Sequence, residues 1–159
     1  FQYGGTVNLA WKGIDFSLAF QGIGKQTSYL YTQMVQPVRD NYGNIPAILD
    51  GKYWSPFNTE EQNRNAKYPR LTNTGKTNNY LTSDFWLFDG SYFRLKNVTL
   101  GYTLPQKWTN KLHLNTARIY VSASDLFCIS DYPKGWDPEM GVSSYPITST
   151  ILVGLNLKL

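Results

Sequence analysis

Five segments of the sequence alternate apolar and polar residues with a period of two, and this pattern limits most strongly what the chain can fold into. Successive side chains of a β-strand point to opposite faces of the sheet, so each segment would present one apolar and one polar face. Each has about the 9–11 residues of a tilted strand that crosses a membrane. Strands are expected at about 1–12, 14–24, 91–104, 117–128 and 147–159.

The connections between the expected strands differ greatly in length. Lys12-Gly13 leaves room only for a tight turn, so the first two strands must form an antiparallel hairpin. The next connection covers about 25–90, which is much longer than loops inside compact soluble domains. Outer-membrane β-barrels combine short periplasmic turns with long outer loops. The connections therefore favour a membrane barrel in which 25–90 is an outer loop.

The direction of the charged side chains follows from the same reasoning. Hydrocarbon offers no hydrogen-bond partners to the backbone, so β-structure can span it only as a closed sheet. The apolar sides of the strands must then face lipid, where a charge near mid-bilayer costs about 2–4 kcal/mol. Asp15, Arg118 and Lys158 fall on the polar sides. They are expected to face the lumen. Five strands are too few to close a barrel, because the smallest have about eight, so the chain is expected to be a fragment of a longer protein.

A soluble carbohydrate-binding β-sandwich is the main alternative, because its strands alternate as well. The nearly uninterrupted apolar sides, the charges opposite them and the unequal loops favour the barrel. The sandwich requires Val98, Ile119 and Val153 to be buried between two stacked sheets, whereas the barrel exposes them to lipid.

The composition fits a protein surface that contacts both water and apolar surroundings. Charged residues make up 16% of the sequence and aromatic residues another 16%. Tyr and Trp join an apolar ring to a polar tip, which suits the aromatic girdles at the two boundaries of membrane barrels. One girdle is expected from Trp86, Phe88, Tyr92 and Phe93, and the opposite one from Trp11, Leu104 and Trp108.

Catalytic, metal, cofactor and nucleic-acid sites are not expected. The net charge of +4 is scattered rather than gathered in a basic stripe. The only histidine, His113, and the only cysteine, Cys128, belong to segments near opposite sides of the membrane, too far apart for a catalytic pair. Gly75-Lys76-Thr77 lacks the upstream glycine of a phosphate-binding loop, because Arg70 occupies that position.

Three carboxylates after the fourth strand, Asp131, Asp137 and Glu139, could in principle bind Ca²⁺ through oxygen atoms. Their spacing is not that of an EF-hand. The segment Asp137-Pro138-Glu139 is expected instead to shape the loop, because proline fixes a turn and carboxylates accept hydrogen bonds from nearby N–H groups.

Several blocks of the sequence resemble the C-terminal part of the SusC/RagA family. Residues 83–102, SDFWLFDGSYFRLKNVTLGY, resemble the family's C-terminal signature. Leu126-Phe127, the GWDPE block at 135–139, Tyr145-Pro146 and the GLNLK block at 154–158 resemble the blocks that follow it, in the same order.

This resemblance implies an all-β fold: the C-terminal strands of a large, about 22-stranded antiparallel transmembrane β-barrel with long extracellular loops. It implies TonB-dependent import of glycans, oligosaccharides or peptides in the bacterial outer membrane, with a SusD-like surface lipoprotein as lid. A homodimeric transporter is one arrangement that it allows. The plug and the TonB box are expected upstream of this chain. A SusC-like barrel that serves as a structural or scaffold subunit is the alternative.

Aromatic residues in the outer loops are candidates for contact with ligand or with the lid, since exposed rings can stack on sugars or peptides. Packing within the loop is the competing interpretation and the favoured one for any single residue. The candidates are Tyr53, Trp54, Tyr80, Trp86 and Trp136.

Overall fold

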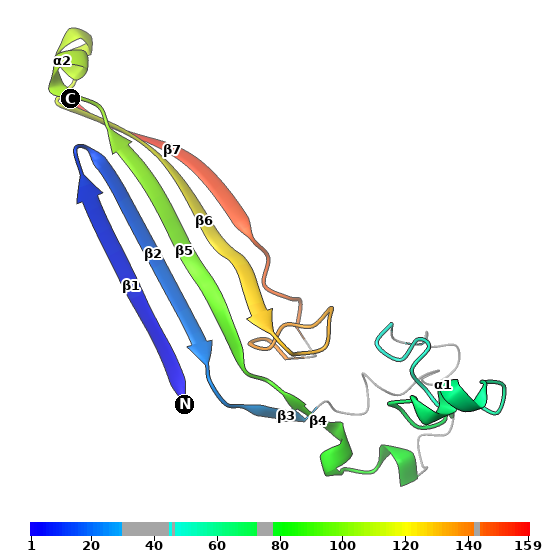
Figure 1. The fold of residues 1–159 in the computed structure, drawn as a ribbon. Coiled ribbons are helices and arrows are strands. Elements are labelled where there is room, and N and C mark those ends of the chain that lie inside the picture. The colour runs from blue at the N-terminus through cyan, green and yellow to red at the C-terminus, as the bar shows by residue number, and fades with distance from the viewer. Residues whose placement is uncertain (30–44, 46, 73–77, 142–143) are drawn as a thin grey trace.

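A computed structural model of the chain describes residues 1–29, 45, 47–72, 78–141 and 144–159. Five long strands form one antiparallel sheet in the order β1-β2-β5-β6-β7, so that each strand pairs with the next long strand along the chain (Figure 1). Within the described ranges the sheet is open, with β1 and β7 at its edges. The long strands are β1 (Gln2–Trp11), β2 (Ile14–Ile23), β5 (Tyr92–Thr103), β6 (Thr116–Ser130) and β7 (Thr150–Lys158).

The long connection between β2 and β5 contains short regular elements. β3 (Thr27–Tyr29) pairs with β4 (Leu87–Asp89) and continues the ladder beyond the ends of β2 and β5. The helix α1 (Glu60–Arg64) lies between them. Its capping box joins Thr59 and Gln62, whose side chains each accept a hydrogen bond from the other's backbone N–H. Two 3₁₀ helices, η1 (Asn78–Tyr80) and η2 (Asp84–Trp86), lead into β4.

The two ends of the sheet differ in what they carry. The Lys12-Gly13 turn, α2 (Gln106–Thr109), η3 (Asn110–Leu112) and the C-terminus lie at one end, called here the turn end (Figure 1). β3, β4 and α1 lie at the other, called the loop end. At the turn, Lys12 has φ 47° and Gly13 has φ 87°, as a two-residue turn between twisted antiparallel strands requires.

The alternation in β5 breaks at a bulge. The register shifts between Leu95 and Asn97, and on the facing strand Asp125 has φ 50°, a conformation that aspartate tolerates better than most residues. Leu95 and Asn97 are two residues apart, which normally places side chains on the same face. Here they lie on opposite faces, because Lys96 is the extra residue. A strict period of two is therefore wrong for the first half of β5.

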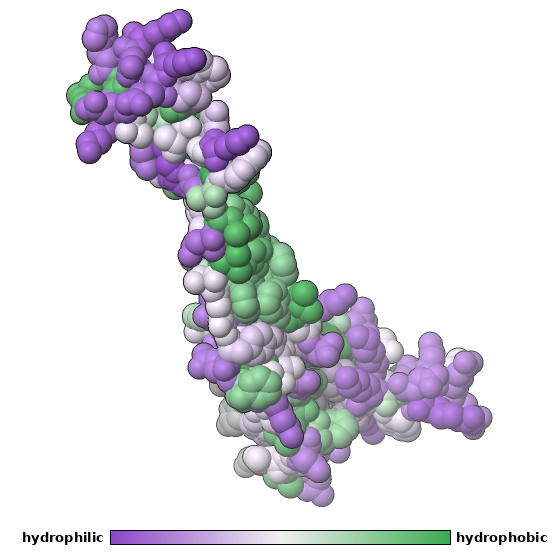
Figure 2. Space-filling model, turned by 60° about the vertical axis from the view of Figure 1, so that its left-hand side comes forward, coloured by the Kyte–Doolittle hydropathy of each residue, from purple (hydrophilic) through white to green (hydrophobic). Residues whose placement is uncertain are grey.

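The middle of the sheet is a single layer. The side chains of Ile119 and Val153 are 46% and 72% exposed, and no second sheet covers them among the described residues. The described residues thus do not show the burial between two sheets that the sandwich requires of Ile119 and Val153. Figure 2 shows the result on the surface, where apolar side chains gather along the waist of the molecule and polar ones at its two ends. Every helix in the described ranges is too short and too polar to cross a bilayer.

Buried side chains lie mainly at the loop end. Leu49, Tyr68 and Trp86 are 1%, 4% and 2% exposed and form a small core of their own. Tyr29, Tyr53 and other partly buried residues pack against it. A second small cluster joins Tyr132 to neighbouring aromatic rings. These cores order the connection at the loop end, not the sheet itself.

Candidate functional site

One face of the sheet, called here the apolar face, is lined by large aliphatic and aromatic side chains. A single row crosses all five strands through the paired residues Leu9, Phe16, Leu100, Val121 and Val153. Four of the five are exposed, and Phe16 is partly buried. Exposed apolar patches of this extent mark contact with lipid or with protein.

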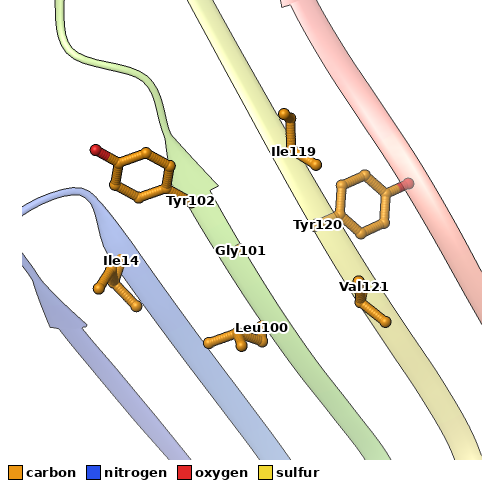
Figure 3. Close-up of a pocket in the computed structure, with 7 residues that line it drawn as sticks. All are labelled: Ile14, Leu100, Gly101, Tyr102, Ile119, Tyr120 and Val121. Carbon is orange, nitrogen blue, oxygen red and sulfur yellow. The ribbon is translucent and has the colours of Figure 1, made fainter.

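The apolar face has a shallow hollow of about 510 Å³ where β2, β5 and β6 run together. Figure 3 shows the side chains around it, with Leu100 and Tyr102 projecting from β5, Ile14 from β2, and Ile119 and Val121 from β6. The lining offers hardly any hydrogen-bonding groups, so the hollow suits hydrocarbon and not a polar substrate.

The opposite, polar face carries hydrogen-bonded rows. The row Asn8, Ser17, Thr99 and Ser122 is made of directly paired residues. Ser17 Oγ donates to Asn8 Oδ1 at 2.7 Å, and the hydroxyls of Thr99 and Ser122 lie 2.9 Å apart. The polar side chains of this row thus hydrogen-bond to one another across the strands, as polar groups on an enclosed surface must.

An ion pair crosses three strands of the polar face. Arg118 on β6 donates through Nε to Asp15 Oδ1 on β2 at 2.8 Å, and its Nη2 contacts the other carboxylate oxygen. The pair passes over β5 at Gly101, where an added Cβ would lie 2.5 Å from Asp15 Oδ1. A side chain at this position would therefore have to displace the ends of Asp15 and Arg118. The guanidinium also lies 5.0 Å from the ring centroid of Tyr120.

Of the three charged residues expected to face the lumen, two form an ion pair with each other and the third is not part of that pair. Asp15 and Arg118 form the ion pair just described. Lys158 lies on the same face of β7, two positions beyond Asn156, which pairs with Arg118. It takes no part in the ion pairs formed among the described residues. The enclosure of this face remains a prediction.

Replacing Gly101 by valine is expected to destabilise the full-length protein. The new side chain must displace the Asp15–Arg118 pair, and such overpacking costs about 1–3 kcal/mol. Thr99→Val is the matched control, because it places the same residue on the same face of β5 and removes only one hydroxyl contact. Denaturant unfolding of both variants in lipid would measure the difference. Equal stabilities would show that the pair needs no free space at this position.

A second group of charges, called here the charge cluster, lies on the polar face near the loop end. It consists of two cations on β5 and three anions from β6 and the loop that follows: Arg94, Lys96, Asp125, Asp137 and Glu139. Arg94 is 3% exposed and its Nη2 lies 2.6 Å from Asp137 Oδ2. Lys96 Nζ lies 2.9 Å from Glu139 Oε2 and 3.2 Å from Asp125 Oδ1.

The cluster depends on the bulge. Because the extra residue reverses the alternation, Arg94 lies on the polar face with Gln21 and Cys128, its partners in the neighbouring strands. The charges of Lys96 and Asp125, two of the three residues at the irregularity between β5 and β6, then meet each other. The sequence pattern pointed to Asp137 and Glu139 as residues that shape the loop, but not to their pairing with Arg94 and Lys96. The available signal was the change of parity in β5, where Arg94 and Lys96 occupy even positions that are apolar from Val98 onward.

The charge cluster pins the loop at 131–141 against the polar face. Asp137 and Glu139 belong to the GWDPE block, and Glu139 also accepts a hydrogen bond from Gln21 Nε2 at 2.7 Å. Asp137 Oδ1 accepts from the backbone N–H of Glu139 at 2.9 Å. The carboxylates thus shape the loop. No group of three or more potential metal ligands occurs in the described part of the chain.

The electrostatics of Glu139 make the pinned loop sensitive to acid. Burial opposes ionisation, but hydrogen bonds from Lys96, Gln21 and Tyr92 outweigh it and lower the pKa of this carboxyl. A carboxyl whose pKa is lowered by folding stabilises the folded state at neutral pH. That contribution is lost as the pH falls through the folded-state pKa.

Acidification is therefore expected to loosen the 131–141 loop, and Glu139→Gln should weaken this pH dependence. Amide hydrogen exchange of the loop in the full-length protein, measured at about pH 7 and about pH 3, would report it. Glu60→Gln is the control, since Glu60 is 90% exposed in a surface pair with Arg64. Identical pH dependence in wild type and Glu139→Gln would contradict the assignment.

The five candidate loop aromatics fall into different environments. Trp86 is 2% exposed and its Nε1 donates to the carbonyl of Asn79 at 3.1 Å, so its assignment to ligand contact or to a membrane girdle is wrong. Tyr53 packs partly against the same core, and Trp136 against Tyr132. Trp54 is 41% exposed and stays a candidate. Tyr80 ends η1, and its role stays a prediction.

The expected aromatic girdles also need correction at the loop end. Tyr92 is 5% exposed, on the polar face, and Phe88 packs between the two small cores. Long-range packing, which a local pattern does not report, buries Tyr92 and half-buries Phe88. At the turn end, Trp11 and Trp108 are 67% and 59% exposed, as a girdle residue would be.

The histidine and the cysteine lie near opposite ends of the sheet. His113 follows η3 at the turn end, and Cys128 lies near the end of β6 that leads to the loop end. Gly75-Lys76-Thr77 lies outside the described residues.

Comparison with known proteins identifies relatives of this chain. No family model matches the chain. It is 31% identical over 176 residues to the TonB-dependent receptor P3 of Formosa agariphila, an alignment that covers 99% of this chain and 16% of that receptor. It is 29% identical over 158 residues to the TonB-dependent receptor SusC of Bacteroides thetaiotaomicron, covering 96% of this chain and 14% of the relative. The chain thus spans only a small part of the length of these receptors.

Solved structures show the same fold. A chain of the RagAB peptide importer in its "closed-closed" state superposes with a TM-score of 0.70 at 24% identity, over 98% of this chain and 17% of that one. The "open-open" state gives a TM-score of 0.68 at 23% identity. The ordered sequence blocks, the curated relatives and the fold agree with one another. The chain belongs to the SusC/RagA family of TonB-dependent receptors.

Proposed function

We propose that the protein containing this chain imports nutrients across the outer membrane, as a TonB-dependent barrel whose closing strands are β1, β2, β5, β6 and β7. The protein lies in the outer membrane, as SusC/RagA proteins do. The observation that carries the proposal is the two-faced single-layer sheet, with an exposed apolar row through Leu100 and Val121 and an ion pair between Asp15 and Arg118 on the other side. Such a sheet needs lipid on one side and an enclosed interior on the other.

The complete barrel would have about 22 strands, with β1 and β7 pairing to upstream strands through their free edges. The turn end would face the periplasm and the loop end the outside, because short turns and long loops are distributed in that way. The plug and the TonB box would lie upstream. Lys158, Asp15 and Arg118 would then face the lumen, and Trp11 and Trp108 the periplasmic boundary.

A SusD-like surface lipoprotein is the proposed partner, with glycans, oligosaccharides or peptides as the proposed substrates. The relatives are named as receptors, and the structural neighbour is named as a peptide importer, which supports an importer without deciding its cargo. Exposed loop aromatics such as Trp54 would be available to the lid or to the cargo. A homodimeric arrangement has no support in these comparisons.

Deleting the full-length gene tests the proposal. Uptake of glycans or peptides should be lost, and uptake by the wild-type strain should stop when the proton-motive force is dissipated by an uncoupler. Affinity purification of the full-length protein should also recover a lipoprotein partner. Unchanged uptake in the deletion strain, with the outer-membrane complex disassembled, would favour the scaffold alternative instead.

A further inference from the structure

A cavity at the loop end carries positive charge that the rest of the described chain leaves unpaired. It measures about 540 Å³ and lies between the 47–68 segment, β4 and the start of the loop after β6. This volume falls within the range of small-ligand sites, about 300–1,000 Å³. Its lining includes Ala47, Ile48, Lys52, Lys67, Phe88 and Lys134. We call it the cationic cleft.

The three lysines are held by different parts of the chain. The backbone carbonyl of Lys52 accepts hydrogen bonds from the N–H groups of Lys67 and Tyr68, both at 2.9 Å, so the first two lysines stand side by side. Lys134 belongs to the turn after β6, which is closed by a hydrogen bond from Trp136 N to Pro133 O at 3.2 Å. Sequence separation hides this convergence, since the three lysines spread over more than half the chain.

Within the described ranges, the lysines of the cleft have no ion-pair partner. The ion pairs among the described residues involve Arg64, Arg94, Lys96 and Arg118, and none involves Lys52, Lys67 or Lys134. Asp131 is the one acidic residue in the lining, so three cations face one anion. Lysine is a compact point charge on a flexible stem, which adapts to carboxylates at different positions.

The rest of the lining favours a peptide over a sugar. The rings of Tyr68 and Tyr132 are 4% and 7% exposed, and Lys67 Nζ already lies 5.9 Å from the centroid of Phe88, so no open aromatic face is offered to a sugar ring. Three lysines against one carboxylate favour a ligand that carries negative charge over a neutral sugar. Ala47, which is exposed, and Ile48, which is half-buried, instead offer apolar contacts for aliphatic side chains.

We propose that the cationic cleft binds an acidic peptide, whose carboxylates pair with the ammonium groups of Lys52, Lys67 and Lys134 while its apolar side chains pack on Ala47 and Ile48. The proposal deepens the proposed function and rests on it, because it names the class of cargo that the loop end receives.

Binding to the purified full-length protein tests the proposal. The probes are an amidated tetrapeptide with two glutamates, the same peptide with glutamines, and a galacturonate trimer. The glutamate peptide should bind tightest, and its affinity should fall as salt is raised from about 0.05 M to about 0.5 M. The triple variant Lys52→Gln, Lys67→Gln, Lys134→Gln should lose about ten-fold in affinity, as expected for three solvent-accessible ion pairs.

The matched control is the triple variant Lys12→Gln, Lys107→Gln, Lys111→Gln, which removes the same charge from the turn end and should bind like wild type. A measurement that needs no variant is protection of Lys52, Lys67 and Lys134 from chemical acetylation by the bound glutamate peptide. Equal binding by both triple variants, no preference for glutamate over glutamine, or no binding at all would overturn the proposal. Tighter binding of the galacturonate trimer would overturn the peptide assignment.

The outcome is separable from that of the proposed function. Import that is intact in the wild type but unaffected by the cleft variant, together with equal binding, would refute the cleft and leave the importer. Cleft binding without any import in the deletion and uncoupler experiments would refute the importer and leave the binding site.

Discussion

Replacing Arg94 by alanine should lower the free energy of unfolding of the full-length protein by about 3–5 kcal/mol and release the loop at 131–141. Arg94 is 3% exposed and faces Asp137, which is 7% exposed, at 2.6 Å. Removing one partner of a buried pair leaves the other charge without compensation in a poorly solvated site, and this causes most of the cost. Two further carboxylates of the charge cluster, Asp125 and Glu139, lose an ion-pair partner in the same step.

Denaturant unfolding in lipid would measure the stability, and limited proteolysis would report cleavage within 131–141. Arg64→Ala is the control, because Arg64 and Glu60 form an ion pair whose side chains are 77% and 90% exposed. Such surface pairs contribute about 0–1 kcal/mol. If Arg94→Ala and Arg64→Ala had the same effect, the cluster would not hold the loop.

The alternation of apolar and polar residues and the turn residues could predict only those features that depend on residues close together in the sequence. The alternation around Val121 and Ser122 predicts a strand because side chains two residues apart share a face. Lys12-Gly13 predicts the hairpin turn because both residues adopt positive φ there. These features need no knowledge of what the strands pack against.

The features that pattern did not predict depend on residues far apart in the sequence. Lys96 and Glu139 are separated by 43 positions, and their meeting requires both the bulge in β5 and the return of the loop after β6. Trp86 looks like an exposed loop aromatic until Leu49 and Tyr68 close over it. In both cases tertiary contacts decide, although the reversed parity at Arg94 was visible in the sequence.

On the polar side of the sheet, large side chains lie over glycines of the neighbouring strands. Tyr120 covers Gly154 on the neighbouring strand, as Arg118 and Asp15 cover Gly101. A ring or an ion pair thus occupies the space over each of these glycines. The polar side is covered by its own side chains and not by a second sheet. A soluble sheet would bury its apolar side instead. The arrangement fits a wall between lipid and an interior.

Adjacent residues of β7 give the sharpest test of which face meets lipid. Val153→Arg should destabilise the full-length protein in lipid by about 2–4 kcal/mol, whereas Leu152→Arg should cost about 0.5 kcal/mol or less, as substitutions at water-facing positions usually do. Val153 pairs with Val121 on the apolar face, and Leu152 pairs with Ser122 on the polar face. Both are aliphatic and exposed in this sheet, at 72% and 52%, so hydrophobicity alone predicts no difference between them.

The face that meets hydrocarbon does predict a difference, because an arginine at Val153 must bring its charge into the bilayer while one at Leu152 points toward water in the lumen. Unfolding in phospholipid vesicles, with the yield of heat-modifiable folded barrel as a second measure, would compare the two variants. A cost for Leu152→Arg equal to or larger than that for Val153→Arg would reverse the orientation of the sheet and remove the main support for the importer. A small cost for both would mean that β7 does not face hydrocarbon on either side.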